Sequence, residues 1–243
     1  MELVILYEDN HVIAVEKPAG MITQRDGTGR TALIDIVKEY VREKYGKPGE
    51  VFLGAAHRLD RIVSGPVLFA RTSKAAGRLF DEFKYRRVIK LYAALVHDPS
   101  GAMTVPGNEP EWKTLTHHLE RRRDTTVIAA SAVPRSKEAS LSYAPIAVGP
   151  HLALLLVNLH TGRKHQIRAQ LAAGGFPITG DFRYGSPEKD DPDSIGLHSC
   201  FIRFNHPTLK IPIEIYSGLP VRISSRIKPQ RPLIEIMQGV IRA

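Results

Sequence analysis

The sequence predicts an α+β fold: a mixed, mostly antiparallel β-sheet with flanking helices. Two observations lead to this prediction. Short apolar runs bounded by turn residues follow one another closely near the N-terminus, as expected for antiparallel strands. Segments with apolar residues at helical spacing are interspersed among the later strands. A mixture of adjacent strands and separate helices is typical of α+β proteins.

The N-terminal elements are the easiest to place. Leu3–Tyr7 and Val12–Val15 are apolar runs on either side of a polar turn, which predicts two paired strands. A helix should follow, because apolar residues recur at helical spacing at Leu33, Ile36, Val37, Tyr40 and Val41. Thr31 is the expected N-cap of this helix and Gly46 its C-terminal stop.

The middle of the chain continues this pattern. Val67–Ala70 is an apolar strand, and a second helix should begin near Ser73 with Ala76, Leu79, Phe80 and Phe83 on one face. The residues from Ile89 to Val96 alternate, which predicts a strand with a core face and an opposite face carrying Lys90 and Tyr92.

The C-terminal half is less regular. Residues 98–136 are expected to form strands and loops, and they include a basic cluster of Arg121, Arg122 and Arg123. Leu152–Leu159 is strongly apolar and predicts a strand, followed by a helix from about His165 to Gly174. Loops and short strands should make up the remainder.

Composition restricts the protein class. A chain of 243 residues suits one large domain or two closely packed halves. No apolar run approaches the ~20 residues that span a bilayer, and the N-terminus has no basic region typical of a signal peptide. The only cysteine is Cys200, which fits a reducing compartment. We therefore expect a cytoplasmic protein, monomeric by default.

The charge balance indicates a polyanionic partner. Lys and Arg number 34 against 25 acidic residues, a formal net charge of +9. Nucleic acid is the first candidate, because phosphate contacts supply most of its sequence-independent affinity.

Two polar segments stand out as candidate functional sites. In the first, Asp60 lies beside Arg58 and Arg61, and nearby cations favour the ionised form of a carboxyl group. In the second, residues 161–168 gather three cations and a histidine where a strand meets the start of a helix. A helix N-terminus attracts anions such as a phosphate or a carboxylate. A surface salt bridge and a solvated basic helix are the alternatives for these segments.

Together the two segments resemble one family. HRLDRIVSG, from His57, resembles the HRLDxxTSG signature of the RluA family of pseudouridine synthases. TGRKHQIRAQLAAGGFPITGDFRYG, from Thr161, resembles its TGRxHQIRxxLxxxGxPxxGDxxYG signature. Weaker matches extend the resemblance from residue 4 to about residue 220. Val63 and Pro66 depart from the residues usual at these positions of the first signature. The departures affect the assignment to a subfamily more than the predicted activity.

The resemblance implies a catalytic domain over residues 1–220 with a central active-site cleft and no preceding S4 RNA-binding domain. Residues 221–243 would be an extension of unknown role. The family converts uridine in RNA to pseudouridine, here in ribosomal or transfer RNA, and needs no cofactor or metal. The partner is RNA, with no membrane and no obligate protein partner.

Roles for individual residues follow from the same resemblance. Asp60 would be the catalytic carboxylate, either as the nucleophile at C1′ or as a base. Arg168 would be its ion-pair partner, with Arg163 as second choice. Tyr92 would pack under the uracil ring, and Leu171 would help to line the uracil pocket. The residues expected to contact RNA are His57, Arg58, Arg61, Lys90, Arg163, Lys164 and His165. His57 or Arg58 would fill the gap left by the flipped base, and the resemblance favours Arg58.

Three other interpretations compete with this one. A non-catalytic RNA-binding protein would keep the basic residues but would not require Asp60. A metal-free hydrolase would use His57 and Asp60 as an acid–base pair, although no convincing nucleophile accompanies them. A metal site formed by His160, His165, His198 and Cys200 fits no standard zinc spacing.

Overall fold

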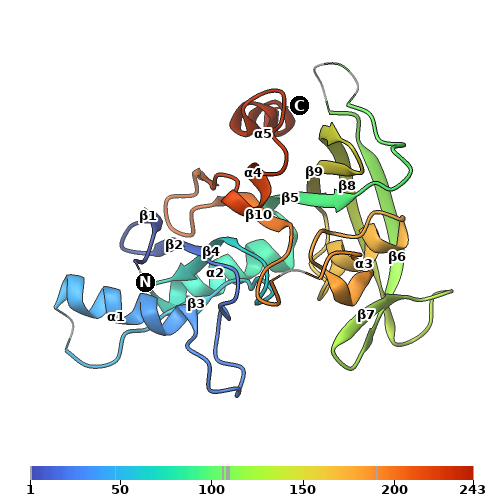
Figure 1. The fold of residues 1–243 in the computed structure, drawn as a ribbon. Helices are drawn as coiled ribbons and strands as arrows, with labels where there is room; N and C mark the ends of the chain where they lie inside the picture. Colours follow the sequence, from blue (N-terminus) through green and yellow to red (C-terminus); the bar gives the residue numbers. More distant parts are fainter. Residues whose placement is uncertain (1, 47, 106, 108–109, 190, 243) are drawn as a thin grey trace. The chain divides into compact units, whose positions relative to one another are not determined.

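The computed structural model describes residues 2–46, 48–105, 107, 110–189 and 191–242, and the chain divides into two compact units (Figure 1). The first unit comprises Met1–Ile89 and Phe201–Ser217. The second comprises Lys90–Cys200 and Gly218–Ala243. Each unit is therefore assembled from two separate stretches of sequence. Helices and antiparallel strands alternate irregularly along the chain, which confirms the predicted α+β class.

The first unit contains a four-stranded antiparallel sheet. Its strands are β1 (Ile5–Glu8), β2 (Val12–Lys17), β3 (Gly54–Ala55) and β4 (Gly65–Ala70), in the order β1-β2-β4-β3. The pairing of β1 with β2 confirms the two strands predicted at the N-terminus. In the same unit, the second half of β10 (Leu197–Asn205) pairs with β11 (Pro212–Tyr216).

Helix α1 (Leu33–Tyr45) confirms the first predicted helix but not its N-cap. The N-cap is Ala32 rather than Thr31, and no side chain caps the helix. Backbone carbonyls supply the acceptors instead: Leu33 N–H donates to Ile22 O at 2.9 Å, and Ile34 N–H donates to Thr23 O at 3.2 Å. The C-terminal stop at Gly46 is confirmed, with a left-handed φ of 56°.

Helix α2 (Ser73–Lys84) begins where the sequence predicts, capped by the hydroxyl of Thr72. Its buried residues are Ala75, Leu79 and Glu82. The predicted face, with Ala76, Leu79, Phe80 and Phe83, is therefore shifted by about one residue from the buried one. Phe80, which the sequence placed on the same face as Leu79, is 59% exposed, whereas Leu79 is fully buried. Helical spacing alone could not separate the two overlapping stripes, because both follow the same period.

Six strands form the sheet of the second unit. These strands follow the order β10-β5-β9-β8-β6-β7. The bounds of the five new strands are β5 (Ile89–His97), β6 (Lys113–Arg122), β7 (Thr125–Ile128), β8 (Ser136–Gly149) and β9 (Leu152–Leu159). Strand β9 confirms the predicted strand Leu152–Leu159. Strand β5 is buried on both faces from Leu91 onward, so the predicted polar face was wrong. A short run without charged residues is equally compatible with burial on both faces.

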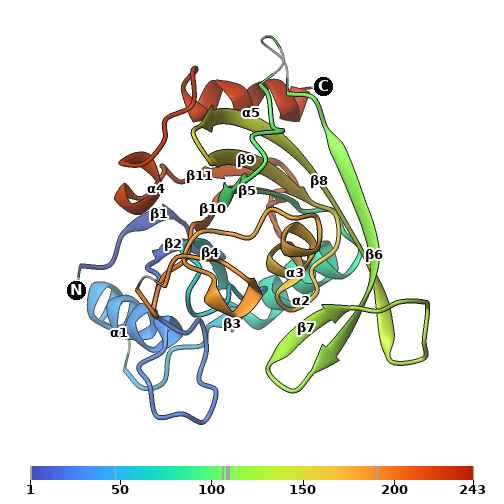
Figure 2. The same ribbon diagram turned by 45° about the vertical axis from the view of Figure 1, so that its right-hand side comes forward.

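Part of the region 98–136 lies outside the described residues. Within the described part, β6 and β7 form an antiparallel hairpin that carries the basic cluster (Figure 2). Helix α3 (Gln166–Ala173) packs against both strands and confirms the helix predicted from His165. A 3-10 helix, η1 (Phe182–Tyr184), follows it.

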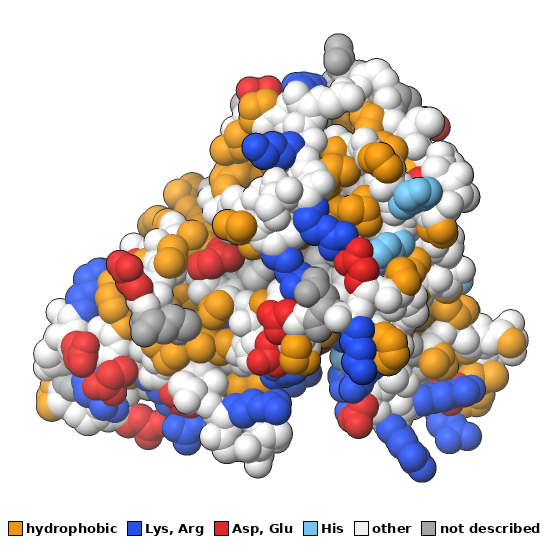
Figure 3. All heavy atoms as spheres, in the orientation of Figure 1, with side chains coloured by type: hydrophobic (Ala, Val, Ile, Leu, Met, Phe, Trp, Pro, Cys, Tyr) orange, Lys and Arg blue, Asp and Glu red, His pale blue; other side chains and the backbone are white. Residues whose placement is uncertain are grey.

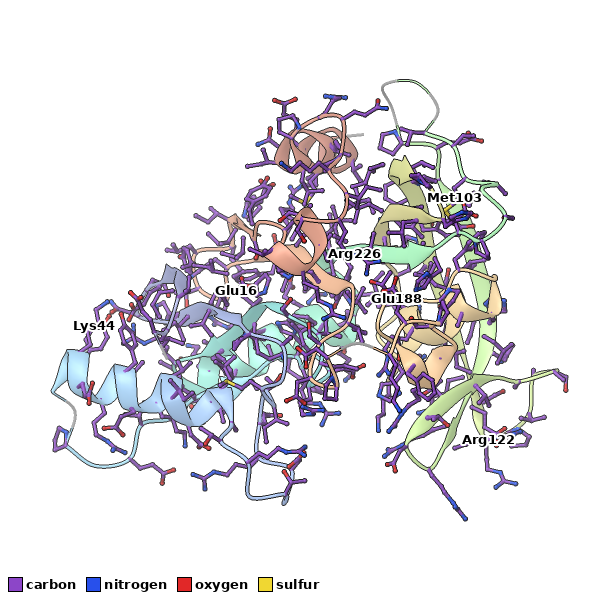
Figure 4. All side chains as sticks on the ribbon, in the orientation of Figure 1. Glu16, Lys44, Met103, Arg122, Glu188 and Arg226 are labelled. Atoms are coloured by element: carbon purple, nitrogen blue, oxygen red, sulfur yellow. The ribbon has the colours of Figure 1, made fainter. Side chains whose placement is uncertain are left out.

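The C-terminal stretch of the second unit is helical. Its elements are α4 (Val221–Ser224) and α5 (Leu233–Arg242), which bury Ile223, Ile236 and Met237. Arg226, between them, forms a bidentate ion pair with Glu188, with both N–O distances at 2.7 Å (Figure 4). None of the helices in the described part of the chain is both long and apolar enough to cross a membrane.

Glu8 fastens the end of α1 to β1. Its carboxylate accepts hydrogen bonds from Tyr40, Lys44 and Tyr45 at 2.9, 2.7 and 2.8 Å, and Lys44 lies at the end of α1 in Figure 4. Burial alone would raise the pKa of Glu8, but these donors outweigh it and hold the pKa below its ordinary value of 4.5.

Glu8 should therefore make the protein sensitive to acid. Because its pKa is lower in the folded than in the unfolded state, its contribution is complete above pH 4.5 and is lost as the pH falls through the folded-state value. Urea denaturation between pH 7 and pH 3 should show a smaller loss of stability for Glu8→Gln than for the wild type. Glu50→Gln, at a carboxylate that is 86% exposed, is the control and should leave the pH dependence unchanged. Parallel curves for Glu8→Gln and the wild type would contradict this assignment.

Candidate active site

Asp60 lies in the loop between β3 and β4 of the first unit. The loop turns directly after Asp60, where Val63 N–H donates to Asp60 O at 3.0 Å. Leu59 is buried, while Asp60 is half-buried and Arg58 is exposed. The loop thus anchors itself through an apolar neighbour and presents a carboxylate between cationic residues.

A buried lysine holds this loop in place. The Lys17 side chain is fully buried, and its Nζ donates to Pro18 O at 2.9 Å, Met21 O at 2.8 Å and Arg61 O at 3.1 Å. These three carbonyls satisfy all three donors of an ammonium group. Lys17 therefore ties the residue after Asp60 to the end of β2.

Further contacts of the loop come from the same part of the chain, residues 17–23, which we call the clamp segment. Gly20 N–H donates to Arg61 O at 2.8 Å from a left-handed backbone with φ of 87°. The Thr23 hydroxyl binds both the N–H and the carbonyl of Leu59, each at 3.3 Å. The backbone is consequently fixed on both sides of Asp60.

Opposing effects set the pKa of Lys17. Burial lowers its pKa to about 7, the negative charge of Asp60 acts in the opposite direction, and Arg61 lowers the pKa further. The ammonium form is favoured by Asp60, so the clamp segment and the candidate catalytic carboxylate stabilise each other electrostatically.

His57, at the start of the first signature, has local structural contacts. Its Nε2 accepts a hydrogen bond from Leu68 N–H at 3.1 Å, and its ring stacks on Phe83 with centroids 4.8 Å apart. These contacts orient His57 toward its own unit. Of the two residues expected to fill the gap in the RNA, the exposed Arg58 is therefore the better candidate.

The second signature builds a turn and a short helix in the second unit. Thr161 Oγ1 donates to Gln166 Oε1 at 2.7 Å, and Arg163 N–H donates to the same oxygen at 3.0 Å. His165, the N-cap of α3, has a left-handed φ of 53°. Arg163 binds Glu138 O at 3.1 Å, and Lys164 is exposed.

Arg168 lies in the first turn of α3, as predicted, and is buried. It forms a bidentate ion pair with Asp181, through Nε at 2.6 Å and Nη2 at 2.8 Å. The predicted pairing of Arg168 with Asp60 joins residues of different units and stays a prediction. A guanidinium has five N–H donors, so binding Asp181 is compatible with a second carboxylate partner.

The remaining predicted residues lie in the second unit. Tyr92, on β5, is 7% exposed, and Leu171 is fully buried in α3. Lys90 approaches the second signature closely: a Cβ added at Gly162 would lie 3.7 Å from its Nζ. Burial lowers the pKa of the neighbouring His160, and the charge of Lys90 lowers it further. Lys90 and the second signature thus lie together.

Sequence reasoning missed the residues that hold the site. Lys17, Thr23, Asp181 and Tyr184 had no predicted role. The only local signal was a lysine next to a Pro-Ala-Gly turn at the end of an apolar strand, and such a lysine is normally solvated. Its burial depends on the loop some forty residues later, which local sequence does not reveal.

Comparison with known proteins identifies the family. A family model described as RNA pseudouridylate synthase matches residues 11–173. The chain belongs to the RNA pseudouridylate synthase family. It is 30% identical to an uncharacterised RNA pseudouridine synthase of Mycoplasma genitalium, over 94% of this chain and 70% of that protein. It is also 30% identical to tRNA pseudouridine synthase C of Vibrio cholerae, over 89% of this chain and 91% of that protein.

Solved structures agree on the fold. Human RNA pseudouridylate synthase domain-containing protein 1 superposes with a TM-score of 0.74 at 23% identity, covering 100% of this chain and 96% of that one. The protein is therefore an enzyme, a pseudouridine synthase, as the two signatures predicted. This membership decides against the hydrolase and against a purely RNA-binding protein. Among the residues that the structure describes, no group of three His, Cys, Asp or Glu side chains is arranged to hold a metal ion.

Replacing Lys17 should loosen the Asp60 loop. Lys17→Met keeps the aliphatic volume but leaves three backbone carbonyls without their donor, so the unfolding free energy should fall by about 2 kcal/mol. Urea denaturation of the purified variant measures this loss. Lys38→Met removes a surface ion pair with Glu50 and is the matched control, expected to cost less than about 1 kcal/mol. Equal stability of the two variants would contradict the clamping role of Lys17.

Proposed function

We propose that this pseudouridine synthase uses Asp60 as its catalytic residue and acts on specific uridines in structured ribosomal or transfer RNA. The observation that carries the proposal is the rigid presentation of Asp60: its loop is fixed on both sides by the clamp segment. Named relatives include both a tRNA pseudouridine synthase and a ribosomal large subunit pseudouridine synthase C, from Vibrio vulnificus, which supports these two RNA classes.

The reaction is an isomerisation in which the N1–C1′ bond of uridine breaks and a C5–C1′ bond forms. The proton on C5 is lost and N1 gains one, so atoms balance without an oxidant, a reductant or a second substrate. Asp60 either attacks C1′ as a nucleophile or removes a proton as a base. No cofactor or metal is required for either route.

Other residues complete this proposal. Arg168 pairs with Asp60 and orients the carboxylate. Tyr92 packs under the detached uracil, and in the last step its oxygen accepts the C5 proton as its own O–H proton passes to water. Leu171 contributes to the wall of the uracil pocket, in addition to its core packing.

RNA binding is assigned mainly to cations. Arg58 enters the gap left by the flipped uridine, with His57 beside it, while Arg61, Lys90, Arg163, Lys164 and His165 contact the RNA around it. We propose the enzyme to be a cytoplasmic monomer without an obligate protein partner.

An arginine-lined pocket extends this basic surface in the second unit. Figure 3 shows Lys and Arg side chains gathered over the β6–β7 hairpin. The pocket, of about 640 Å³, is lined by Glu120, Arg121, Arg122, Arg123, Asp124, Thr125, Arg135 and Arg183. Five arginines against two acids favour phosphate groups of the RNA backbone.

Asp60→Asn tests the catalytic assignment. It keeps the size of the side chain but removes its charge and its nucleophilic oxygen, so pseudouridine formation should fall below detection while RNA affinity changes little. Tritium release from RNA labelled at uridine C5 measures the reaction, and filter binding measures the affinity. The expected loss of stability is about 1 kcal/mol if Asp60 contributes only a partly exposed ion pair.

Asp35→Asn is the matched control, since it makes the same change at another carboxylate of the first unit that pairs with an arginine. It should leave turnover unchanged. A folded Asp60→Asn protein with wild-type turnover would refute the mechanism.

The arginine-lined pocket makes a separate prediction about salt. Each phosphate contact steepens the fall of log K with log salt by roughly 0.7–0.9. Replacing Arg121, Arg122 and Arg123 by Gln should flatten this slope by about 2, measured by filter binding from 50 to 200 mM salt. Replacing Arg25, Arg30 and Arg42 by Gln removes the same charge from the first unit and should leave the slope unchanged. Equal slopes for both triple variants would place the pocket outside the RNA footprint.

A further inference from the structure

The 3-10 helix η1 follows α3 and lies at a junction of polar contacts in the second unit. Asp181, directly before η1, binds Arg168, and Tyr184, the last residue of η1, contacts Arg168, Thr126 and His165. Both residues are fixed positions of the second signature, in its final GDxxYG, and both follow the residues 11–173 that the family model matches. Their contacts converge on the start of α3.

The ion pair of Arg168 with Asp181 is the most buried bidentate pair described in this unit. The side chains are 4% and 1% exposed, and the contacts are 2.6 and 2.8 Å. A bidentate carboxylate fixes the plane of a guanidinium as well as its position. Burying two charges costs free energy that their attraction offsets only in good geometry. Such a pair is therefore better explained by a need for orientation than by stability alone.

Tyr184 restrains the same guanidinium from a second direction. Its ring centroid lies 4.7 Å from Arg168 Cζ, a cation–π contact. Its hydroxyl accepts a hydrogen bond from Thr126 N–H at 2.8 Å and lies 3.0 Å from His165 Nδ1. The ring is thereby held between β7 and the N-cap of α3.

Thr126 links strand β7 to the segment before α3. Its hydroxyl donates to Lys164 O at 2.8 Å, two residues before α3 begins, and the residue is 3% exposed. Strand β7, η1 and the start of α3 are consequently joined through Tyr184 and Thr126. The first helical turn, which carries Arg168, cannot shift without breaking these bonds.

We infer that Asp181 and Tyr184 are positioning residues that set the orientation of the Arg168 guanidinium for the reaction. The inference rests on the proposed function, in which Arg168 pairs with the catalytic Asp60. Asp181 and Tyr184 act through Arg168 and do not touch the substrate. Their loss should therefore slow the chemical step without weakening RNA binding.

Single-turnover rates and RNA affinities of four variants test the inference. Asp181→Asn keeps the shape but removes the charge, and its rate should fall about 10- to 100-fold because a misplaced catalytic group costs that much. Tyr184→Phe keeps the ring and loses the two hydroxyl contacts, so its rate should fall about 3- to 10-fold by the same argument. The RNA dissociation constant should stay within about twofold of wild type in both. Arg168→Lys and the double variant Arg168→Lys/Asp181→Asn complete a cycle.

The cycle separates positioning from a general structural role. If Asp181 acts through Arg168, adding Asp181→Asn to Arg168→Lys should reduce the rate by less than about threefold, because the group that it orients is already gone. Losses that multiply fully would overturn the inference, as would a wild-type rate for Asp181→Asn. Should Asp181→Asn fail to fold, the rate of Tyr184→Phe decides, and a wild-type value would reject the inference.

The matched control is Glu188→Gln, which breaks a more exposed bidentate arginine pair of this unit, Arg226–Glu188 (Figure 4). It should leave the rate unchanged. The outcomes also distinguish the two proposals. An inactive wild-type protein, or a fully active Arg168→Lys, contradicts the proposed function, whereas a slow Arg168→Lys beside a fully active Asp181→Asn contradicts only this inference.

Discussion

The buried ammonium group of Lys17 is the contact on which the geometry around Asp60 depends. A lysine is seldom buried completely, because removing its charge from water is costly. Here three backbone carbonyls surround the ammonium group, and one of them belongs to Arg61, directly after Asp60. Burying Lys17 costs free energy, but its hydrogen bonds fix a loop that strands β3 and β4 alone would leave mobile. Lys17 is also the last residue of β2, so its side chain links the four-stranded sheet directly to the candidate catalytic loop.

The second unit uses the same physical solution with different groups. Arg168 is buried against Asp181 and covered by Tyr184, and the turn before α3 is held by Gln166 and Thr161. In each unit a candidate catalytic side chain, on a loop in the first and at the start of a short helix in the second, is held by buried polar contacts. Such preorganisation matters for an isomerase, because its side chains must orient the carboxylate and hold the detached base.

Local patterns predicted much of this arrangement. Apolar alternation and helical spacing located β1, β2, β9, α1 and α3 to within a few residues, and the two polar signatures marked Asp60 and Arg168 as candidates. The misses have identifiable causes. Phe80 was placed on the apolar face of α2 because overlapping helical stripes share one period. Tyr92 was placed opposite the core face because residues alternate along β5, but alternation does not exclude burial on both faces. The partners of Lys17 and Arg168 escaped because they are set by chain segments distant in sequence.

A crystal structure of the Asp60→Asn variant bound to an RNA with its target uridine would test the account most directly. We predict that the side chain at position 60 lies within about 3.5 Å of C1′ of the flipped uridine, the distance expected of a near-attack geometry. We also predict that Arg168 contacts that side chain and that Lys17 keeps its three carbonyl partners. A target ribose bound away from position 60, or a loop that rearranges to reach it, would contradict the claim that the clamp segment presents a preformed catalytic carboxylate.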